Sequence, residues 1–282
     1  MDPSQGCLYV VATPIGNLED VTHRALRVLR EADLIAAEDT RHTRKLLNHY
    51  EIGTPVTSYH DHNEATKAES LVMDIQSGKR IALVTDAGTP CISDPGYRLV
   101  RLCHEERLPV VAVPGPCAAV AALSIAGLPA STFTFHGFFP RKASDASALL
   151  TAIAAVPGTH VFYEAPNRLA ATLHEVAARW PDTDVYVARE LTKLHEELMR
   201  GPALEIARRC RESEVRGECV VIVAVPPPPA QAVPDEAGLR AEVEWVMTTR
   251  AVSRRDAVRE IAGKYGIARK AVYAAAVLES DS

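Results

Sequence analysis

Short apolar runs alternate with longer segments of helical periodicity along the first half of the chain. The runs whose length and β-branched content predict buried strands are 8–13, 34–37, 80–84 and 110–113. The segments that predict helices are 21–32, with Asp20 as its cap, 63–77, 97–107 and 117–127. Because strands and helices alternate, we expect a mainly parallel sheet with helices on its faces.

The second half has a different pattern, with more strands and fewer helices. Residues 133–147 predict a half-buried strand followed by an exposed basic loop. Residues 160–173 predict a strand, a turn and a helix, and 185–201 predicts a strand that extends through Lys193. A clean apolar run over 216–225 predicts a closing strand. We therefore expect a second, more antiparallel and mixed sheet.

A proline-rich stretch separates these strands from the end of the chain. Residues 226–234, PPPPAQAVP, predict a stiff and extended linker. Beyond it, the expected helices of a small bundle are 235–249, 253–265, with Ser253 as a cap, and 268–278. The domains that follow from this reading are an N-terminal α/β domain (1–115), a second α/β domain (116–227) and a helical extension (235–282).

Composition places the chain among ordinary globular proteins. Of its 282 residues, 47% are hydrophobic and 24% are charged, which is ample for a packed core. No apolar run approaches the ~20 residues of a membrane span, and the first residues lack the features of a signal peptide. The 6 cysteines are scattered without a Cys-x-x-Cys pair. We expect a cytoplasmic protein with reduced thiols and no membrane association.

Charge is distributed unevenly. The whole chain carries −5, which gives no general attraction for nucleic acid. Between Arg250 and Tyr273, however, 7 basic residues face 2 acidic ones, a local charge of +5. Helices joined by a turn and carrying local positive charge favour contact with nucleic acid. An ordinary solvated bundle is the alternative interpretation.

The stretch with the most candidate chemistry is VTDAGTPCISDPG, residues 84–96. Gly88 and Gly96 permit unusual backbone angles and close approach of a ligand, while Pro90 and Pro95 stiffen the loop. The loop directly follows a predicted strand, and ligands of α/β proteins bind beyond the carboxyl ends of strands. We therefore expect a ligand site here, with a purely structural turn as the alternative.

Other polar clusters follow the neighbouring predicted strands. Residues 38–43, EDTRHT, follow the second strand, and Arg41 and Arg44 suit phosphate groups. The small-residue turn at 114–119 follows the fourth predicted strand. His60 and His62 form a His-x-His pair, but no third ligand lies at a usual spacing, so we expect no metal. The chain has no GxGxxG, Walker or GxSxG motif, which disfavours dinucleotide enzymes, nucleotide hydrolases and α/β-hydrolases.

Seven motifs in order resemble the tetrapyrrole-methylase-like (class III) methyltransferases over about 8–225. They are VVATPIGNLED, AAEDTRHTRKLL, TDAGTPCISDPG, VPGPCAAVAALSIAGLP, YEAPNRL, ARELTKLHEE and RGECVVIV. The resemblance implies two α/β domains, S-adenosylmethionine in the cleft between them, and a homodimer. Porphyrinoid methylases carry Gly-Asp-Pro where this chain has residues 86–90, whereas EDTRHT and ARELTK are similar to the RNA-methylating subgroup. The similarity to that subgroup implies 2′-O-methylation of a cytidine ribose in the 16S ribosomal RNA of the 30S subunit.

The resemblance also implies roles for individual residues. The implied cofactor-binding residues are Pro14, Asp86, Ala87, Gly88, Thr89, Pro90, Ser93, Asp94, Pro95, Gly96, Pro114, Gly115, Ala118, Tyr163, Glu164, Ala165, Gly217 and Glu218. The candidates for a general base are Glu38, Lys193 and Glu190, with Asp39 and Asp86 as further possibilities. The implied RNA-binding residues are Arg41, His42, Arg44, Arg189, Arg254, Arg255 and Lys270.

Two other functions are compatible with the same residues. One is a methylase of tetrapyrroles or other small molecules on the same fold, which would have no need of a basic tail. The other is a non-catalytic RNA-binding assembly factor. The intact glycine-containing loop at 86–90 weighs against the second, because a disused site has no need of those glycines.

Overall fold

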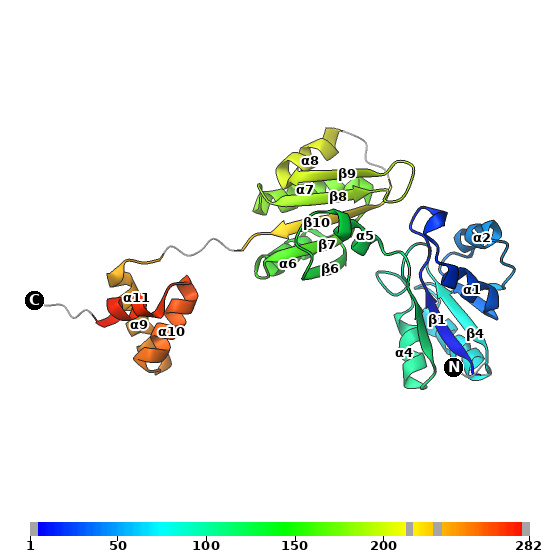
Figure 1. Ribbon diagram of the computed structural model, residues 1–282, viewed down its shortest axis with the longest axis horizontal. Helices are drawn as coiled ribbons and strands as arrows, with labels where there is room; N and C mark the ends of the chain where they lie inside the picture. The colour runs from blue at the N-terminus through cyan, green and yellow to red at the C-terminus, as the bar shows by residue number, and fades with distance from the viewer. Residues whose placement is uncertain (1–4, 213–216, 228–232, 278–282) are drawn as a thin grey trace, which may run out of the picture. The chain divides into compact units, whose positions relative to one another are not determined.

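The computed structural model describes residues 5–212, 217–227 and 233–277 (Figure 1). The chain divides into two compact units, Met1–Pro226 and Pro227–Ser282. Most of the predicted linker and the predicted end of the last helix at Leu278 lie outside the described residues. Two sheets make up the first unit.

The first sheet is fully parallel, as predicted. Its strands are β1 (Cys7–Val11), β2 (Leu34–Ala37), β3 (Val56–Ser58), β4 (Arg80–Val84) and β5 (Val110–Val113). They lie in the order β3-β2-β4-β1-β5, with every pairing parallel. The sequence pattern missed β3 because three residues are too few to show a period. The carboxyl ends of all five strands therefore share one edge of the sheet.

Helices cover both faces of this sheet. One face packs against α1 (His23–Glu31) and α2 (Thr40–His49), and the other against α3 (Glu64–Gln76) and α4 (Tyr97–Glu105). The prediction of Asp20 as the cap of the first helix is wrong: Asp20 ends a short 3₁₀ turn. The hydroxyl of Thr22 accepts the amide hydrogen of Ala25 over 3.0 Å instead.

The second sheet is mixed. Its strands are β6 (Phe133–Phe138), β7 (Gly158–Glu164), β8 (Asp184–Arg189), β9 (Glu197–Pro202) and β10 (Cys219–Val225). They lie in the order β6-β7-β10-β8-β9, and only the β6–β7 pair is parallel. The predicted extension of one strand through Lys193 is wrong. The chain leaves β8 at Arg189 because Glu190 and Thr192 adopt left-handed backbone angles, and it returns as β9.

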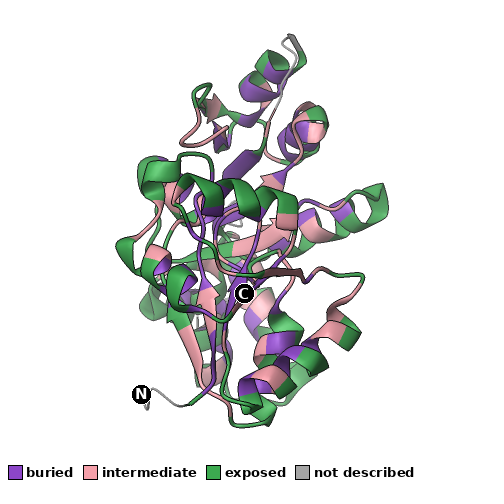
Figure 2. Cartoon of the chain, turned by 90° about the vertical axis from the view of Figure 1, so that its right-hand side faces the viewer, coloured by how far each residue is buried: buried purple, intermediate pink, exposed green. Residues whose placement is uncertain are grey.

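The two faces of the second sheet are covered unequally. One face packs against α6 (Ala143–Ala154), α7 (Pro166–Arg179) and α8 (Ala203–Glu212), and the other against α5 (Ala118–Ile125). The exposed basic loop expected up to residue 147 ends earlier, because its alanines belong to α6. In Figure 2 the central strands are coloured as buried and the outer helix faces as exposed.

The C-terminal unit is a three-helix bundle, as predicted. It consists of α9 (Glu236–Arg250), α10 (Arg254–Tyr265) and α11 (Arg269–Val277) around a core that includes Val243, Ile261 and Val272. Ser253 caps α10, and its hydroxyl accepts the amide hydrogen of Asp256. None of the helices in the described part of the chain combines the length and apolar character that a bilayer crossing requires.

Candidate active site

Backbone hydrogen bonds join the loop after β4 to the segment after β1. The amide of Thr13 donates to the carbonyl of Gly88 over 2.9 Å, and the amide of Gly88 donates back over 3.0 Å. Gly88 has a φ of +84°, a region that favours glycine. The hydroxyl of Thr89 donates to the carbonyl of Pro116 over 3.1 Å, which holds the loop to the turn after β5. Three strand ends therefore meet where α/β sheets bind ligands.

The backbone of this loop is strained. Cys91 and Ser93 have φ values of +70° and +66° although both carry side chains. Gly96 follows with a φ of +139°, and a Cβ atom there would lie 2.6 Å from the sulfur of Cys91. Left-handed non-glycine residues cost on the order of 1–3 kcal/mol and occur where the surroundings fix them, often at ligand sites. The loop is therefore held in one specific shape.

Carboxylates gather at the same strand ends. The hydroxyl of Thr85 donates to Oε2 of Glu38 over 2.6 Å, and the amide of Asp86 donates to the same oxygen over 3.3 Å. The amide of Asp39 donates to Oδ1 of Asp86 over 3.0 Å. Burial, and after it the charge of Glu38, raises the pKa of Asp94 to about 7, and burial also raises the pKa of Asp86. This corner of the site therefore favours a positively charged ligand group.

The second sheet supplies the facing wall. Glu164, at the end of β7, is 2% exposed and contacts Nη1 of Arg168 at 3.3 Å. Its carboxylate also accepts hydrogen bonds from the hydroxyl of Thr172 and, over 2.7 Å, from the amide of Ala165. Beside it, the Tyr163 hydroxyl accepts the amide hydrogen of Ala119 over 3.3 Å, and burial raises the pKa of Tyr163 above its ordinary value. Hydrogen bonds and an ion pair therefore hold the polar side chains of this wall in place.

The turn after β8 holds a charge cluster at the edge of the site. Nζ of Lys193 lies 2.8 Å from Oε1 of Glu190 and 3.2 Å from Oε2 of Glu218. The amide of Glu218 donates to the same oxygen of Glu190 over 3.0 Å. A Cβ atom on Gly217 would lie 2.2 Å from the Glu190 carboxyl, so glycine makes room for this cluster. Burial opposes the charges of Glu190 and Lys193, but their mutual hydrogen bond prevails, lowering the pKa of Glu190 and raising that of Lys193.

The same turn contacts the segment after β1. The amide of Asn17 donates to the hydroxyl of Thr192 over 3.1 Å. A Cβ atom on Gly16 would lie 2.4 Å from Cγ of Lys193. The two sheets of the first unit therefore meet directly beside the carboxylates and the strained loop.

Together these segments line a cavity of about 400 Å³. The predicted site residues that line it are Glu38, Asp86, Ala87, Gly88, Thr89, Ser93, Asp94, Ala118, Tyr163, Glu164, Ala165, Lys193 and Glu218. Those that do not are Pro14, Pro90, Pro95, Gly96, Pro114, Gly115, Gly217 and Glu190. Two of these residues leave space for side chains next to the cavity: Gly96 accommodates the sulfur of Cys91, and Gly217 accommodates Glu190.

The individual site residues that the resemblance implied did not include most of the apolar lining. The additional residues are Ile15, Ile92, Cys117, Phe138, Pro166, Ala188, Leu191, Cys219 and Val220. All of them except Phe138 lie inside the seven motifs, and that membership was the available signal. Phe138 lies outside the motifs, at the end of an aromatic strand, and only the structure shows that it is 60% exposed.

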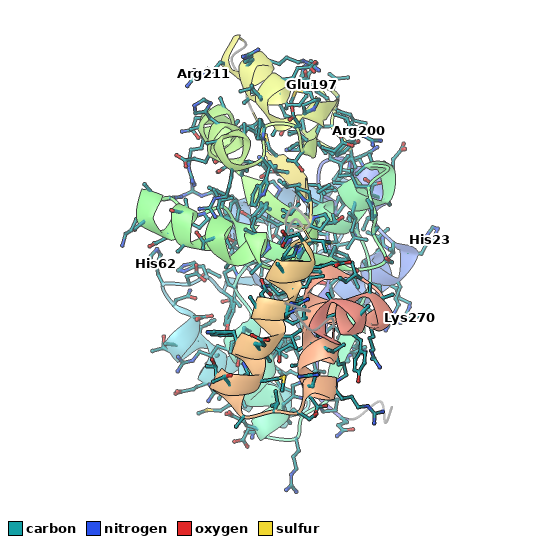
Figure 3. The ribbon with its side chains drawn as sticks, turned by 90° about the vertical axis from the view of Figure 1, so that its left-hand side faces the viewer. His23, His62, Glu197, Arg200, Arg211 and Lys270 are labelled. Atoms are coloured by element: carbon teal, nitrogen blue, oxygen red, sulfur yellow. The ribbon has the colours of Figure 1, made fainter. Side chains whose placement is uncertain are left out.

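The predicted RNA-binding residues lie in three places. Arg41, His42 and Arg44 are exposed on α2, which begins directly after Glu38 and Asp39. The side chain of Arg189 is 19% exposed and its Nε lies 2.9 Å from Glu197 (Figure 3 labels the glutamate). The remaining residues, Arg254, Arg255 and Lys270, are exposed in the C-terminal unit.

A parallel sheet and a mixed sheet that share one cavity at their strand ends define a two-lobed α/β ligand-binding protein. Among solved structures, that of uroporphyrin-III C-methyltransferase from Thermus thermophilus with S-adenosylhomocysteine aligns with a TM-score of 0.55. The alignment covers 78% of this chain and 97% of that one at 20% identity, a level that shows the fold. The chain belongs to the tetrapyrrole (corrin/porphyrin) methylase family, whose model matches residues 7–207.

Curated relatives within this family are much more similar. Ribosomal RNA small subunit methyltransferase I of Escherichia coli O157:H7 is 52% identical over 225 residues, 79% of each chain. The protein of the same name from Synechocystis sp. is 42% identical over 278 residues, which covers 98% of this chain and 99% of the relative. The second alignment extends through the C-terminal unit.

Proposed function

We propose that this protein is an S-adenosylmethionine-dependent methyltransferase of small-subunit ribosomal RNA. The observation that carries the proposal is the 52% identity to a ribosomal RNA small subunit methyltransferase, together with a cavity lined by the motifs of the resemblance. In finer detail, we propose that it methylates the 2′-hydroxyl of a cytidine in 16S RNA. The tetrapyrrole alternative draws support from the family description and from structures at about 20% identity, whereas the curated relative at 52% identity is a ribosomal RNA methyltransferase.

The lining residues fit S-adenosylmethionine. A volume of about 400 Å³ falls within the range of about 300–1,000 Å³ typical of small-molecule sites. The carboxylates of Asp86 and Asp94 suit the positive sulfonium and amino groups, and Gly88, which has no side chain, lets a ligand come close to the loop. Ala165 and Val220 offer apolar surface for the adenine ring. We assign these residues to cofactor binding.

The cofactor supplies a methyl group that its positive sulfur already activates. The protein then has to position the ribose hydroxyl, which is a weak nucleophile, and accept its proton. General-base assistance typically contributes 10²–10⁴-fold. Within the described residues, both hydrogen bonds to the Glu38 carboxylate end on Oε2, which leaves Oε1 available to a substrate hydroxyl. Glu38 is therefore our first candidate for the base.

Lys193 has a different role in this proposal. Its pKa lies above the ordinary value, so it keeps its proton at neutral pH and does not act as a base. A cation that lines the cavity can stabilise the negative charge that develops on the ribose oxygen. Glu190 does not line the cavity, and its pKa is lowered, so we assign it to holding Lys193 in place.

The RNA would approach over α2 and the turn after β8. Arg41, His42 and Arg44 are exposed and follow directly on Glu38, so phosphate contacts there would bring a ribose to the cavity. Arg189 is a further proposed contact, although Glu197 already holds its guanidinium. In the C-terminal unit we propose Arg254, Arg255 and Lys270 as RNA contacts.

We further propose a homodimer that acts in the cytoplasm. Large apolar side chains are exposed at the start of α4 and on α5, where Tyr97, Val120 and Ile125 are 69%, 54% and 49% exposed. Covering them with a second copy would account for this exposure. Light scattering coupled to size-exclusion chromatography tests this point, and a strictly monomeric protein at micromolar concentration would contradict it.

The decisive experiment uses labelled S-adenosylmethionine and 30S particles from a strain that lacks the enzyme. We expect label in 16S RNA, at the 2′-oxygen of one cytidine once the nucleotide is mapped. Glu38→Gln should lower the rate while calorimetry shows retained cofactor binding. Label in a tetrapyrrole but not in RNA would favour the small-molecule alternative, and RNA binding without methyl transfer would favour an assembly factor.

A further inference from the structure

The C-terminal unit contains a cleft of its own. Side chains of α10 and α11 surround a cavity of about 360 Å³. Its lining residues are Arg255, Val258, Arg259, Arg269, Lys270 and Tyr273. Val258 is 3% exposed and belongs to the core of the bundle, whereas the ring of Tyr273 is 51% exposed. Figure 3 labels Lys270 on α11. Four cations and one accessible aromatic ring therefore share one hollow.

Ion pairing within this unit is selective. Arg250 pairs with Glu260 at 2.7 Å, and Lys264 pairs with Glu242 at 2.7 Å. In the cleft, Arg259 pairs with Asp256 at 3.0 Å. Among the residues that the structure describes, no carboxylate forms an ion pair with the other three cations of the cleft, which are Arg255, Arg269 and Lys270.

Unneutralised cations crowded around a hollow repel one another, and the fold gains nothing from keeping them together. An anion that enters the hollow would remove this repulsion and gain charge-assisted hydrogen bonds from the guanidinium groups. The family model ends at residue 207, so it assigns no role to this unit. The grouping of these cations around a hollow therefore needs its own explanation.

We propose that this cleft binds one nucleotide of single-stranded RNA. The phosphate would contact Arg255, Arg269 and Lys270, and the base would stack on the ring of Tyr273. The proposal rests on the proposed function, which makes ribosomal RNA the substrate, and it specifies which form of RNA the C-terminal unit recognises.

The exposed tyrosine distinguishes this ligand from other anions. Aromatic rings beside basic side chains are the usual platform for unpaired bases, which expose both faces for stacking. A base within a duplex is stacked on its neighbours and cannot also stack on Tyr273. A free phosphate or an acidic peptide would use the cations but would leave the ring without a role.

The test uses the full-length chain and fluorescently labelled single-stranded RNA, with fluorescence anisotropy measured at several salt concentrations. Tyr273→Ala should weaken binding about tenfold or more without changing the salt dependence, whereas Tyr273→Phe should retain affinity. The double variant Arg269→Ala/Lys270→Ala should weaken binding and lower the slope of log affinity against log salt by at most about 0.7, the value for one neutralised phosphate of a single strand. Arg208→Ala, which removes an exposed cation from α8, is the charge control.

Two results would overturn the proposal: unchanged RNA affinity of both cleft variants, or equal losses for Tyr273→Phe and Tyr273→Ala. Duplex RNA of the same sequence should be insensitive to Tyr273→Ala, and equal sensitivity would contradict recognition of an unpaired base. Circular dichroism should show an intact fold in each variant.

Calorimetry with S-adenosylmethionine separates the two proposals. Cleft-dependent RNA binding without cofactor binding refutes the proposed function, and cofactor binding with cleft-independent RNA binding refutes this inference.

Discussion

Nζ of Lys193 lies 2.8 Å from Oε1 of Glu190. The contact depends on the turn after β8, in which Glu190 has a φ of +51°. The side chains of Lys193 and Glu190 are 30% and 20% exposed. Because the pairing raises the pKa of Lys193 and lowers that of Glu190, both residues are charged at neutral pH. The only member of the pair that lines the cavity is thus a fixed cation.

Replacing Lys193 by methionine should lower methyl transfer by about 10²-fold, because the charge that stabilises the developing oxyanion is lost. Cofactor affinity should change only a few-fold. Single-turnover kinetics and calorimetry measure the two effects. Lys79→Met is the matched control, since Lys79 also pairs with a carboxylate at 2.8 Å but does not line the cavity. A Lys193→Met enzyme with more than half the normal rate would contradict this role.

Gly88→Val should abolish binding of S-adenosylmethionine while the fold remains intact. A β-branched residue at a φ of +84° is strained, and relief of that strain would move the loop away from its hydrogen bonds to Thr13. Calorimetry measures binding, and circular dichroism checks the fold. Gly53→Val is the control, because a Cβ atom at Gly53 meets nothing within 4 Å. Unchanged affinity in a folded Gly88→Val protein would remove this loop from the cofactor site.

Asp94 should make stability depend on pH. Burial and the neighbouring carboxylates of Glu38 and Asp86 raise its pKa from 3.8 to about 7. The folded protein therefore retains a proton that the unfolded chain releases, and this stabilisation is complete below about pH 4 and is lost as the pH rises to about 7. Asp94→Asn cannot ionise, so its stability relative to wild type should increase over the same range.

The expected gain for Asp94→Asn at pH 8 is on the order of 1 kcal/mol after allowance for solvent screening. Urea denaturation at pH 5, 6, 7 and 8 measures it. The hydroxyl of Thr85 opposes this shift by a hydrogen bond that lowers the pKa of Asp94, so Thr85→Val should retain the pH dependence that Asp94→Asn removes. If the difference between Asp94→Asn and wild type is the same at every pH, the raised pKa is refuted.

Removal of residues 231–282 should weaken RNA methylation far more than cofactor binding. The cofactor cavity is lined only by residues of the first unit, and the C-terminal unit has a separate core. We expect calorimetry with S-adenosylmethionine to give the same affinity within about twofold. Initial rates on 30S particles at limiting RNA concentration should fall at least tenfold, by loss of phosphate contacts. Equal rates for the full and truncated chains would show that the extension has no part in substrate binding.

The sequence indicated this cavity mainly through glycines, because the residue type itself signals an unusual backbone conformation. Gly88 and Gly96 marked the central loop because few other residues tolerate their angles. Lys193 was predicted as a candidate base, and it lines the cavity, but its place in a turn was missed, since Glu190 and Thr192 are not residues that normally signal a left-handed turn. The cap at Thr22 was missed because Asp and Thr are both preferred residues at a helix N-cap, and Asp20 lies only two residues before Thr22.

The apolar lining was harder to predict for a different reason. Leu191 and Val220 have the same character as core residues, and only the three-dimensional arrangement directs them to the cavity rather than to a core. Ion pairs such as that of Arg189 with Glu197 join two strands whose pairing no local pattern revealed. Motifs identify where backbone and charge are special, but they do not reveal which apolar side chains face a ligand.

The strand at the centre of the second sheet is also the last one in the sequence of its unit. β10 lies between β7 and β8, and the cavity wall includes Glu218, Cys219 and Val220 at its start. During synthesis, β7 and β8 therefore emerge from the ribosome before the strand that joins them. The cavity that we propose for the methyl donor is completed only when translation of the first unit is almost finished, so a nascent chain that ends before β10 lacks part of its wall.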